Sequence, residues 1–305
     1  MMGTIAQLFF DAASLGGIYA MAALGIALIF GVMNLVNFAQ GEYIAFCVFA
    51  LIVPSNDAIA VMFLGNAPAI ILIPVLLGIG AVLAVVSEYV VFRHMRRADP
   101  VAMMISSFAL GFVIQNSLLA VYGSRPKAIS LWSGLNTPVE VAGADVPLLQ
   151  VIVILSTLAI VSALALLLKR TRIGLEMRAA AENFKMARLL GVKANSVITG
   201  AFALSGALAA AVALIMVTQT GVADVRMGGQ IMLVAFIATV IGGMGSLPGA
   251  VAAGFLIGIA SVLLQAFLPI EARPFRDAFL YALVIASLLL KPQGLFASRL
   301  SKTRV

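Results

Sequence analysis

Apolar runs long enough to cross a lipid bilayer follow one another along almost the whole chain. A transmembrane helix needs roughly 17–25 such residues. Charged residues make up 10% of the chain, whereas a soluble domain carries about 25%. We therefore predict an all-α fold, a polytopic transmembrane helix bundle of about 8–10 segments, in which residues 1–305 form one domain. Nine runs have spanning or near-spanning length: 7–33, 35–53, 68–92, 101–121, 147–168, 196–217, 229–244, 249–268 and 277–290.

Three basic clusters set the expected orientation in the membrane. Residues 93–99, 169–193 and 291–304 together carry fourteen basic and three acidic residues, a net charge of +11, and the rest of the chain carries −4. Lys and Arg collect on the cytoplasmic side of membrane proteins. With nine segments, this places the N-terminus outside and the C-terminus in the cytoplasm. The overall charge of +7 is thus explained by topology and membrane lipid, and no nucleic acid partner is expected.

A polar stretch separates the first two apolar runs. Asn34, Asn37 and Gly41 fall on one helical face, and Gln40 and Glu42 stand beside them. A charged side chain at a helix centre costs on the order of 2.5–3.5 kcal/mol to insert, so it faces a bundle interior or water. Two interpretations stay open. The stretch is either a cytoplasmic turn with Glu42 at a helix N-terminus, or a break that lines a translocation path and offers amide groups to a zwitterion.

Glycine gathers in a second unusual stretch, residues 242–249. Gly242, Gly243 and Gly245 deny the backbone a continuous helix, and unpaired peptide groups at membrane depth are tolerated only inside protein or along a cavity. A tight turn and a pore-lining break both fit this composition. No Lys-Ser or Lys-Thr follows the glycines, so the stretch is not a phosphate-binding loop, and we do not expect this chain to hydrolyse ATP by that route.

The segment 169–194 joins two apolar runs and has an amphipathic pattern. Small and apolar residues recur at three- and four-residue steps with charged residues opposite, which indicates a short helix on the cytoplasmic face. Such a helix either lies on anionic lipid as a connector or places its small apolar face into a groove of a cytosolic partner. The apolar set is Met177, Ala180, Phe184, Ala187 and Gly191, and the charged set is Arg178, Glu182 and Lys185.

Several motifs, in this order along the chain, resemble the permeases of ATP-binding-cassette importers for branched-chain amino acids. They are Asn37-Phe38-Ala39-Gln40-Gly41-Glu42, Gln115-Asn116, Met177-Arg178-Ala179, Ala187-Arg188-Leu189-Leu190-Gly191-Val192, Ile241-Gly242-Gly243-Met244-Gly245-Ser246, and Lys291-Pro292-Gln293-Gly294. The resemblance runs colinearly from about residue 14 to residue 298, and it is to the LivH-like subunit of that family.

This resemblance implies one multi-pass permease subunit in a bacterial inner membrane. It implies a second homologous permease subunit, giving a heterodimer, two cytoplasmic ATPase subunits, and an extracytoplasmic binding protein that delivers an amino acid. No cofactor or metal site is implied. Segment 169–194 would be the cytoplasmic coupling-helix loop, with Arg178, Glu182, Phe184, Ala187, Leu190 and Gly191 as the coupling residues. The residues expected along the translocation path are Asn34, Asn37, Gln40, Gly41, Glu42, Gln115, Asn116, Gly242, Gly243 and Gly245.

Two alternatives belong to other functional classes. A secondary transporter or channel that needs no nucleotide fits the composition equally well. A membrane-embedded enzyme needs paired acids or a metal cluster, and the embedded acids Asp11, Glu42 and Glu88 have no His or Cys at ligand spacing. Within the family the substrate stays open, because Gln40 stands where a histidine is usual. Branched-chain or related hydrophobic amino acids are expected, with urea, short amides and aromatic or other carboxylates as alternatives.

Overall fold

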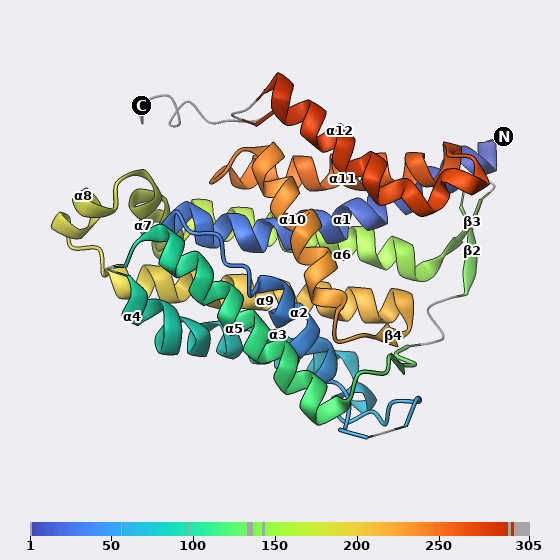
Figure 1. Cartoon of the computed structure of the whole chain (residues 1–305), viewed down its shortest axis with the longest axis horizontal. Coiled ribbons are helices and arrows are strands. Elements are labelled where there is room, and N and C mark those ends of the chain that lie inside the picture. The colour runs from blue at the N-terminus through green and yellow to red at the C-terminus, as the bar shows by residue number, and fades with distance from the viewer. Residues whose placement is uncertain are drawn as a thin grey trace. The chain divides into compact units, whose positions relative to one another are not determined.

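The chain forms two compact units, each assembled from separate stretches of sequence. The computed structural model describes residues 2–55, 57–96, 98–132, 137–141, 144–291 and 294–295. The first unit comprises Met1–Leu24, Ser133–Leu166 and Val234–Val305. The second comprises Gly25–Trp132 and Leu167–Leu233. Helices dominate both units (Figure 1).

Six helical stretches among the described residues are long and apolar enough to cross a membrane. Their exposed surfaces carry many large apolar side chains, which suits contact with lipid. The predicted all-α, polytopic membrane fold is therefore confirmed. The helices are α1 (Met2–Met33), α3 (Ala69–Ser87), which continues through a π-helical turn (Glu88–Phe92) into α4 (Arg93–Met95), α5 (Pro100–Tyr122), α6 (Leu148–Arg170), α9 (Ala194–Thr220) and α11 (Leu247–Phe267).

The other three apolar runs form shorter helices. α2 (Gln40–Phe49) has 10 residues, α10 (Met227–Gly242) has 16 and α12 (Arg276–Leu290) has 15. Six long and three short helices thus account for the nine expected segments. α10 and α12 match the short predicted runs 229–244 and 277–290, whereas α2 is much shorter than its predicted run 35–53. α2 is short because residues 34–39 before it are not helical. α10 stops where Gly243 takes a φ of +92°, a left-handed conformation that ends helices.

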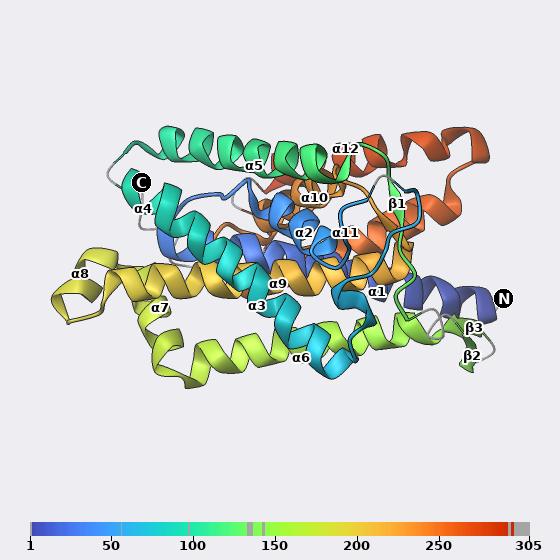
Figure 2. The same ribbon diagram turned by 90° about the horizontal axis from the view of Figure 1, so that it is seen from below.

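In the second unit the long helix α9 is the central element. α3 packs along α9, and α2 also packs on it, as Figures 1 and 2 both show. The α3–α9 crossing is close because two glycines meet there. A Cβ atom at Gly80 would stand 2.3 Å from the carbonyl oxygen of Gly206, and one at Gly206 would stand 2.1 Å from that of Gly80. Small residues allow such approach where lipid supplies no hydrophobic drive.

In the first unit the N-terminal part of α1 packs against α11. A Cβ atom at Gly254 would stand 2.5 Å from Cα of Ala20, and one at Gly258 would stand 2.3 Å from Cα of Gly16. The spacing of four places both glycines on one face of α11. α12 packs along α11 (Figure 1), so α11 lies between two helices of its unit.

Short strands occur only in loops of the described chain. In the second unit β1 (Lys127–Ala128) pairs antiparallel with β4 (Val222–Ala223). In the first unit β2 (Pro138–Val141) and β3 (Ala144–Pro147) form an antiparallel hairpin. Neither pair contributes a sheet to the core, so the packing of helices alone positions the candidate site.

Candidate functional site

The polar stretch at residues 34–42 is a break between α1 and α2. Asn34 takes a left-handed φ of +53°, and the chain stays non-helical up to Ala39. Asn37 is fully buried. Its Oδ1 accepts the backbone N–H of Ala39 at 3.1 Å, and its Nδ2 donates to the Tyr43 hydroxyl at 3.4 Å. The Asn37 amide therefore provides a hydrogen-bond partner for a backbone N–H group that lacks one at the break in the helix.

Gln40 is held at both ends of its amide by Ser205 of α9. Its Nε2 donates to the carbonyl oxygen of Ser205 at 3.0 Å. The Ser205 hydroxyl lies 2.8 Å from Oε1 of Gln40 and 2.8 Å from the carbonyl oxygen of Gly25, and donates its one hydrogen to either. A satisfied polar network in a buried place fixes geometry, so α2 is tied to α9 and to the end of α1.

Gly41 brings α2 against the first turn of α10. A Cβ atom at Gly41 would stand 2.2 Å from the carbonyl oxygen of Gly228, and one at Gly228 would stand 2.3 Å from that of Gly41. Real Cβ atoms do not come this close to backbone. Both positions therefore need glycine for the two helices to cross as they do.

Glu42 is buried next to this crossing and keeps one oxygen unused. The residue is 8% exposed, and its Oε2 has no hydrogen-bond partner among the described residues. Gly111 of α5 lies opposite, since a Cβ atom there would stand 3.4 Å from Cγ of Glu42. The amides of Asn37 and Gln40 serve the protein itself, whereas Glu42 has bonding capacity left.

The predicted pair Gln115 and Asn116 divides between two faces of α5. Gln115 is four residues after Gly111, hence on the same face, and is half-buried. Asn116 is exposed, and its Nδ2 donates to the carbonyl oxygen of Phe112 on its own helix at 2.7 Å. Of the two, only Gln115 shares the α5 face that meets Glu42.

In the first unit the glycine-rich stretch is a tight turn between α10 and α11. A Cβ atom at Gly242 would stand 2.4 Å from the carbonyl group of Gly249, so the two helices touch where they join. Gly243 and Gly245 have φ angles of +92° and +86°. Ser246 begins α11, its Oγ accepting the N–H of Gly249 at 3.2 Å. The turn is one of the two forms that the sequence left open.

The segment 169–194, predicted as one amphipathic helix, forms two. α7 (Arg172–Glu182) and α8 (Phe184–Leu189) are separated at Asn183, whose side chain accepts the N–H of Met186 at 3.1 Å. Thr171 caps α7 in the same way, accepting the N–H of Gly174 at 3.1 Å. Asn and Thr are strong helix N-caps, so the break at Asn183 starts a new helix. Figure 2 shows both helices at the N-terminal end of α9.

The small apolar face of this segment is turned toward the chain itself. Met177, Ala180 and Ala187 are all buried. Met177 reaches α9, because a Cβ atom at Gly200 would stand 3.0 Å from its Cε. These three residues therefore support the segment from within, and are not free for a groove on another protein. The periodicity identified the face correctly as apolar but did not tell which surface it covers.

The charged side chains of the segment lie on its other sides. Arg178 and Glu182 are exposed, and Arg178 Nη2 donates to the carbonyl oxygen of Lys169 at 3.4 Å. The side chain of Phe184, another predicted coupling residue, lies outside the described residues.

Exposed apolar side chains gather at the end of α8. Leu189 is 81% exposed and Leu190 is 85% exposed, with Met186 also exposed. Gly191 has a φ of +89° and nothing within 4 Å of its Cβ position, so it serves the left-handed turn rather than a close approach. Leu190 is among the coupling residues predicted from the motif. Leu189 is not, and its exposure is seen only in the structure, where the opposite face of the segment is buried.

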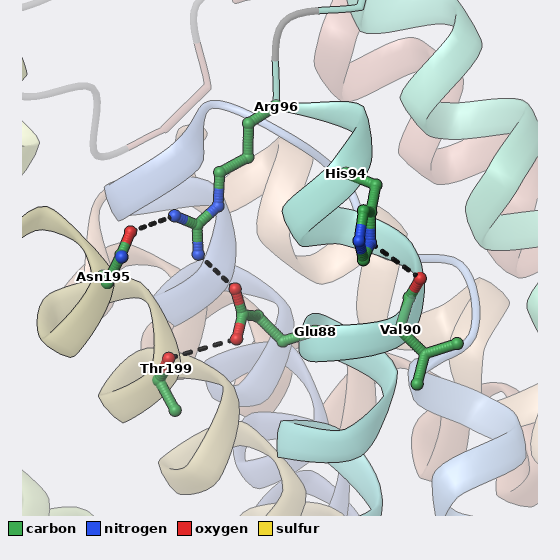
Figure 3. A network of polar contacts seen from close by, with 6 residues as sticks. All are labelled: Glu88, Val90, His94, Arg96, Asn195 and Thr199. Atoms are coloured by element: carbon green, nitrogen blue, oxygen red, sulfur yellow. Dashed lines mark hydrogen bonds and ion pairs between the residues drawn. The ribbon is translucent and has the colours of Figure 1, made fainter.

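A polar cluster connects the end of α3–α4 to the start of α9. α7 packs against α9 as well. Glu88 is 1% exposed and opens the π-helical turn. One of its oxygens pairs with Arg96, the other accepts from Oγ1 of Thr199 at 3.1 Å, and Arg96 also donates to Asn195 (Figure 3). Removing one partner of a buried ion pair costs about 3–5 kcal/mol. The cluster therefore fastens these helices together next to α7.

Comparison with known proteins gives matches along almost the full length. Residues 8–288 match the family described as "Branched-chain amino acid transport system / permease component". The high-affinity branched-chain amino acid transport system permease protein BraD of Pseudomonas aeruginosa is 30% identical over 92% of each chain. The permease protein LivH of Escherichia coli K12 is 30% identical over 95% of this chain and 94% of its own. The autoinducer 2 import system permease protein LsrC of Escherichia coli is 30% identical over 52% of this chain and 49% of its own.

Proposed function

Because the chain belongs to the branched-chain amino acid transport system permease family, we propose that it forms part of the path by which branched-chain or related hydrophobic amino acids are imported. As a member of that family it is a multi-pass membrane protein homologous to bacterial inner-membrane permeases, and a permease component rather than an enzyme. Such a permease works with ATPase and binding-protein partners. The observation that carries the substrate proposal is the likeness to LivH and BraD over more than nine-tenths of the chain.

The proposed assembly is a heterodimer of this chain with a second homologous permease. Two ATPase subunits bind on the cytoplasmic side, and a binding protein delivers the amino acid from outside. The charge distribution supports an N-terminus outside and a C-terminus in the cytoplasm, since net +11 falls in the three clusters assigned to the inside. The whole chain would then act as one permease domain.

The proposed coupling element is the loop at 169–194, which contains α7 and α8. Leu189 and Leu190 are its exposed apolar tip, suited to a hydrophobic groove on an ATPase. Ala187 and Gly191 shape the turn, and Arg178, Glu182 and Phe184 flank it. Movement of the tip would pass to α9 and, through the Glu88 cluster, to α3. The element would then have two positions that differ in their contacts, as coupling between sites requires.

The proposed translocation path follows the two breaks. In the second unit Asn37, Gln40 and Gly41 hold the break in shape, and Glu42 offers an unused oxygen. Gln115 adds an amide on the face of α5 that carries Gly111, and Asn34 and Asn116 complete the proposed set. In the first unit Gly242, Gly243 and Gly245 form the second break. Irregular backbone at membrane depth suits a cavity or a protein interior.

Substrate competition in cells tests the proposed substrate. In a strain that lacks its own branched-chain importers and expresses this chain with its partners, radiolabelled leucine uptake should appear. A hundredfold excess of isoleucine or valine should reduce that uptake by roughly tenfold or more, because competitors share one site. Urea, acetamide and benzoate should leave it unchanged. If the cells take up urea or benzoate but no leucine, the substrate is one of those alternatives and the proposal is wrong.

A further inference from the structure

The three acidic residues within apolar stretches differ in what their carboxylates contact. Asp11 accepts hydrogen bonds from two glutamine amides. Glu88 pairs with an arginine and accepts a hydrogen bond from a threonine. The Oε2 atom of Glu42 has no donor among the described residues, although the residue is only 8% exposed. Of the three, Glu42 alone has a buried oxygen left unsatisfied.

A buried carboxylate without compensation is strongly unfavourable. The surroundings of Glu42 do not supply that compensation. Arg96–Glu88 and Arg276–Asp277 are the ion pairs among the described residues, so no cation of this part of the chain pairs with Glu42. α2 has Ala39 at its N-cap with no side-chain cap, and the amide of Gln40 is already bonded on both sides.

The side chain of Glu42 faces α5. Gly111 has no side chain, and a Cβ atom there would stand 3.4 Å from Cγ of Glu42, so the carboxylate arm lies against the backbone of α5. Gln115 is on the same face of α5 as Gly111. This face of α5 therefore has a carboxylate beside it at Gly111 and a neutral amide one helical turn away, at Gln115.

We propose that the carboxylate of Glu42 binds the α-ammonium group of the amino acid as it passes along the path. An ammonium group offers three N–H donors and a positive charge, which are what the free oxygen lacks. Hydrogen bonds between ionised partners are about twice as strong as neutral ones. The inference rests on the proposed function and adds to it that this subunit selects substrates with an amino group over simple carboxylates and neutral amides.

Exchange of Glu42 for glutamine tests the assignment, because it removes the charge and keeps the shape. The complex of this chain with its cognate permease, ATPases and binding protein is reconstituted in liposomes for wild type, Glu42→Gln, Glu42→Asp and the matched control Glu271→Gln, an exposed residue of a 3-10 turn. The measurements are radiolabelled leucine uptake, ATP hydrolysis stimulated by the binding protein, and the thermal midpoint of the purified complex. Uptake is measured in sodium and in choline buffers.

We expect Glu42→Gln to lower leucine uptake by about tenfold or more, with stimulated ATP hydrolysis kept and the thermal midpoint unchanged or raised, since a buried charge is removed. Glu42→Asp should recover part of the uptake, and Glu271→Gln should match wild type. Wild-type uptake in Glu42→Gln would overturn the assignment. A fall in uptake that is matched by a loss of folded complex would also overturn it. So would uptake that depends on sodium in wild type but not in Glu42→Gln, because the carboxylate would then bind a sodium ion rather than the ammonium group.

The proposed function is judged separately, on the wild-type complex alone. If wild type imports no amino acid, the substrate proposal fails before any variant is compared, and a substrate without an amino group overturns both statements. If wild type imports leucine and Glu42→Gln does so equally well, only the role of Glu42 is wrong.

Discussion

Replacing Leu189 and Leu190 together by aspartate is expected to reduce ATP-driven uptake by more than about tenfold, because a buried anchor at an interface contributes about 2 kcal/mol or more. The two side chains are 81% and 85% exposed, so they add almost nothing to the packing of their own chain. Aspartate cannot be solvated in an apolar groove. The measurement is leucine uptake by the reconstituted complex with ATP present, together with the thermal midpoint.

A matched control separates coupling from a general effect of added charge. Val101 is an exposed apolar residue at the start of α5, beside the basic cluster 93–99, which the charge pattern assigns to the same side of the membrane. Val101→Asp should keep uptake within about twofold of wild type, as surface changes cost within about 0.5 kcal/mol. If the double leucine variant shows normal uptake, or if Val101→Asp loses as much uptake, the α8 tip is not part of the coupling element.

Substitution of Gly228 by valine is expected to disrupt the second unit. Its Cβ atom would stand 2.3 Å from the carbonyl oxygen of Gly41, so α2 and α10 must separate or the chain must misfold. Overpacking typically costs about 1–3 kcal/mol, and here the obstacle is backbone, which cannot change rotamer. Folded yield in detergent and the thermal midpoint should both fall, and uptake should be lost with them.

The next residue provides the control for that substitution. A Cβ atom at Gly229 would have nothing within 4 Å, although the residue belongs to the same first turn of α10. Gly229→Val should therefore keep the fold and most of the uptake. If both variants behave alike, the close crossing of Gly41 and Gly228 does not hold the unit together.

The helices could be predicted from the sequence because apolar length and helix formation are linked at membrane depth. All nine runs do contain helices. The start of α2 could not be predicted, since it depends on backbone angles at single residues. Asn34 takes a φ of +53° and the chain stays non-helical up to Ala39, although the second run was expected to begin at residue 35. Gly243, at φ +92°, ends α10 just before the predicted end of its run.

The candidate site was less predictable because its partners are far apart in the chain. The motif drew attention to Gln40 and Glu42, but nothing near them in sequence indicates Ser205, which is 165 residues away from Gln40. The same holds for Gly111 and Gly228. Nothing in the sequence shows that Gly111 faces Glu42 or that Gly228 meets Gly41, because these contacts depend on how α5 and α10 pack. Two polar side chains of one motif differ in their contacts, since both ends of the Gln40 amide have a polar partner and Oε2 of Glu42 has none.

The amphipathic segment shows a further limit of periodicity. Period alone identified a small apolar face, yet Ala187 on that face is buried within the chain while Leu190 is exposed. A helix with apolar residues on two sides gives a weak periodic signal, and only the packing on α9 decides which side remains free. The capping of α8 by Asn183 was readable in principle, because Asn is a strong N-cap.

The most direct test of the proposed function is leucine uptake into liposomes that contain this chain, its cognate permease and the two ATPase subunits. The binding protein is added to the external solution, on the side from which the substrate enters. Uptake should require both enclosed ATP and the binding protein, and should stop when ATP is replaced by a non-hydrolysable analogue. Leucine uptake at the same rate without ATP would contradict the account and would make the chain a transporter that works without nucleotide.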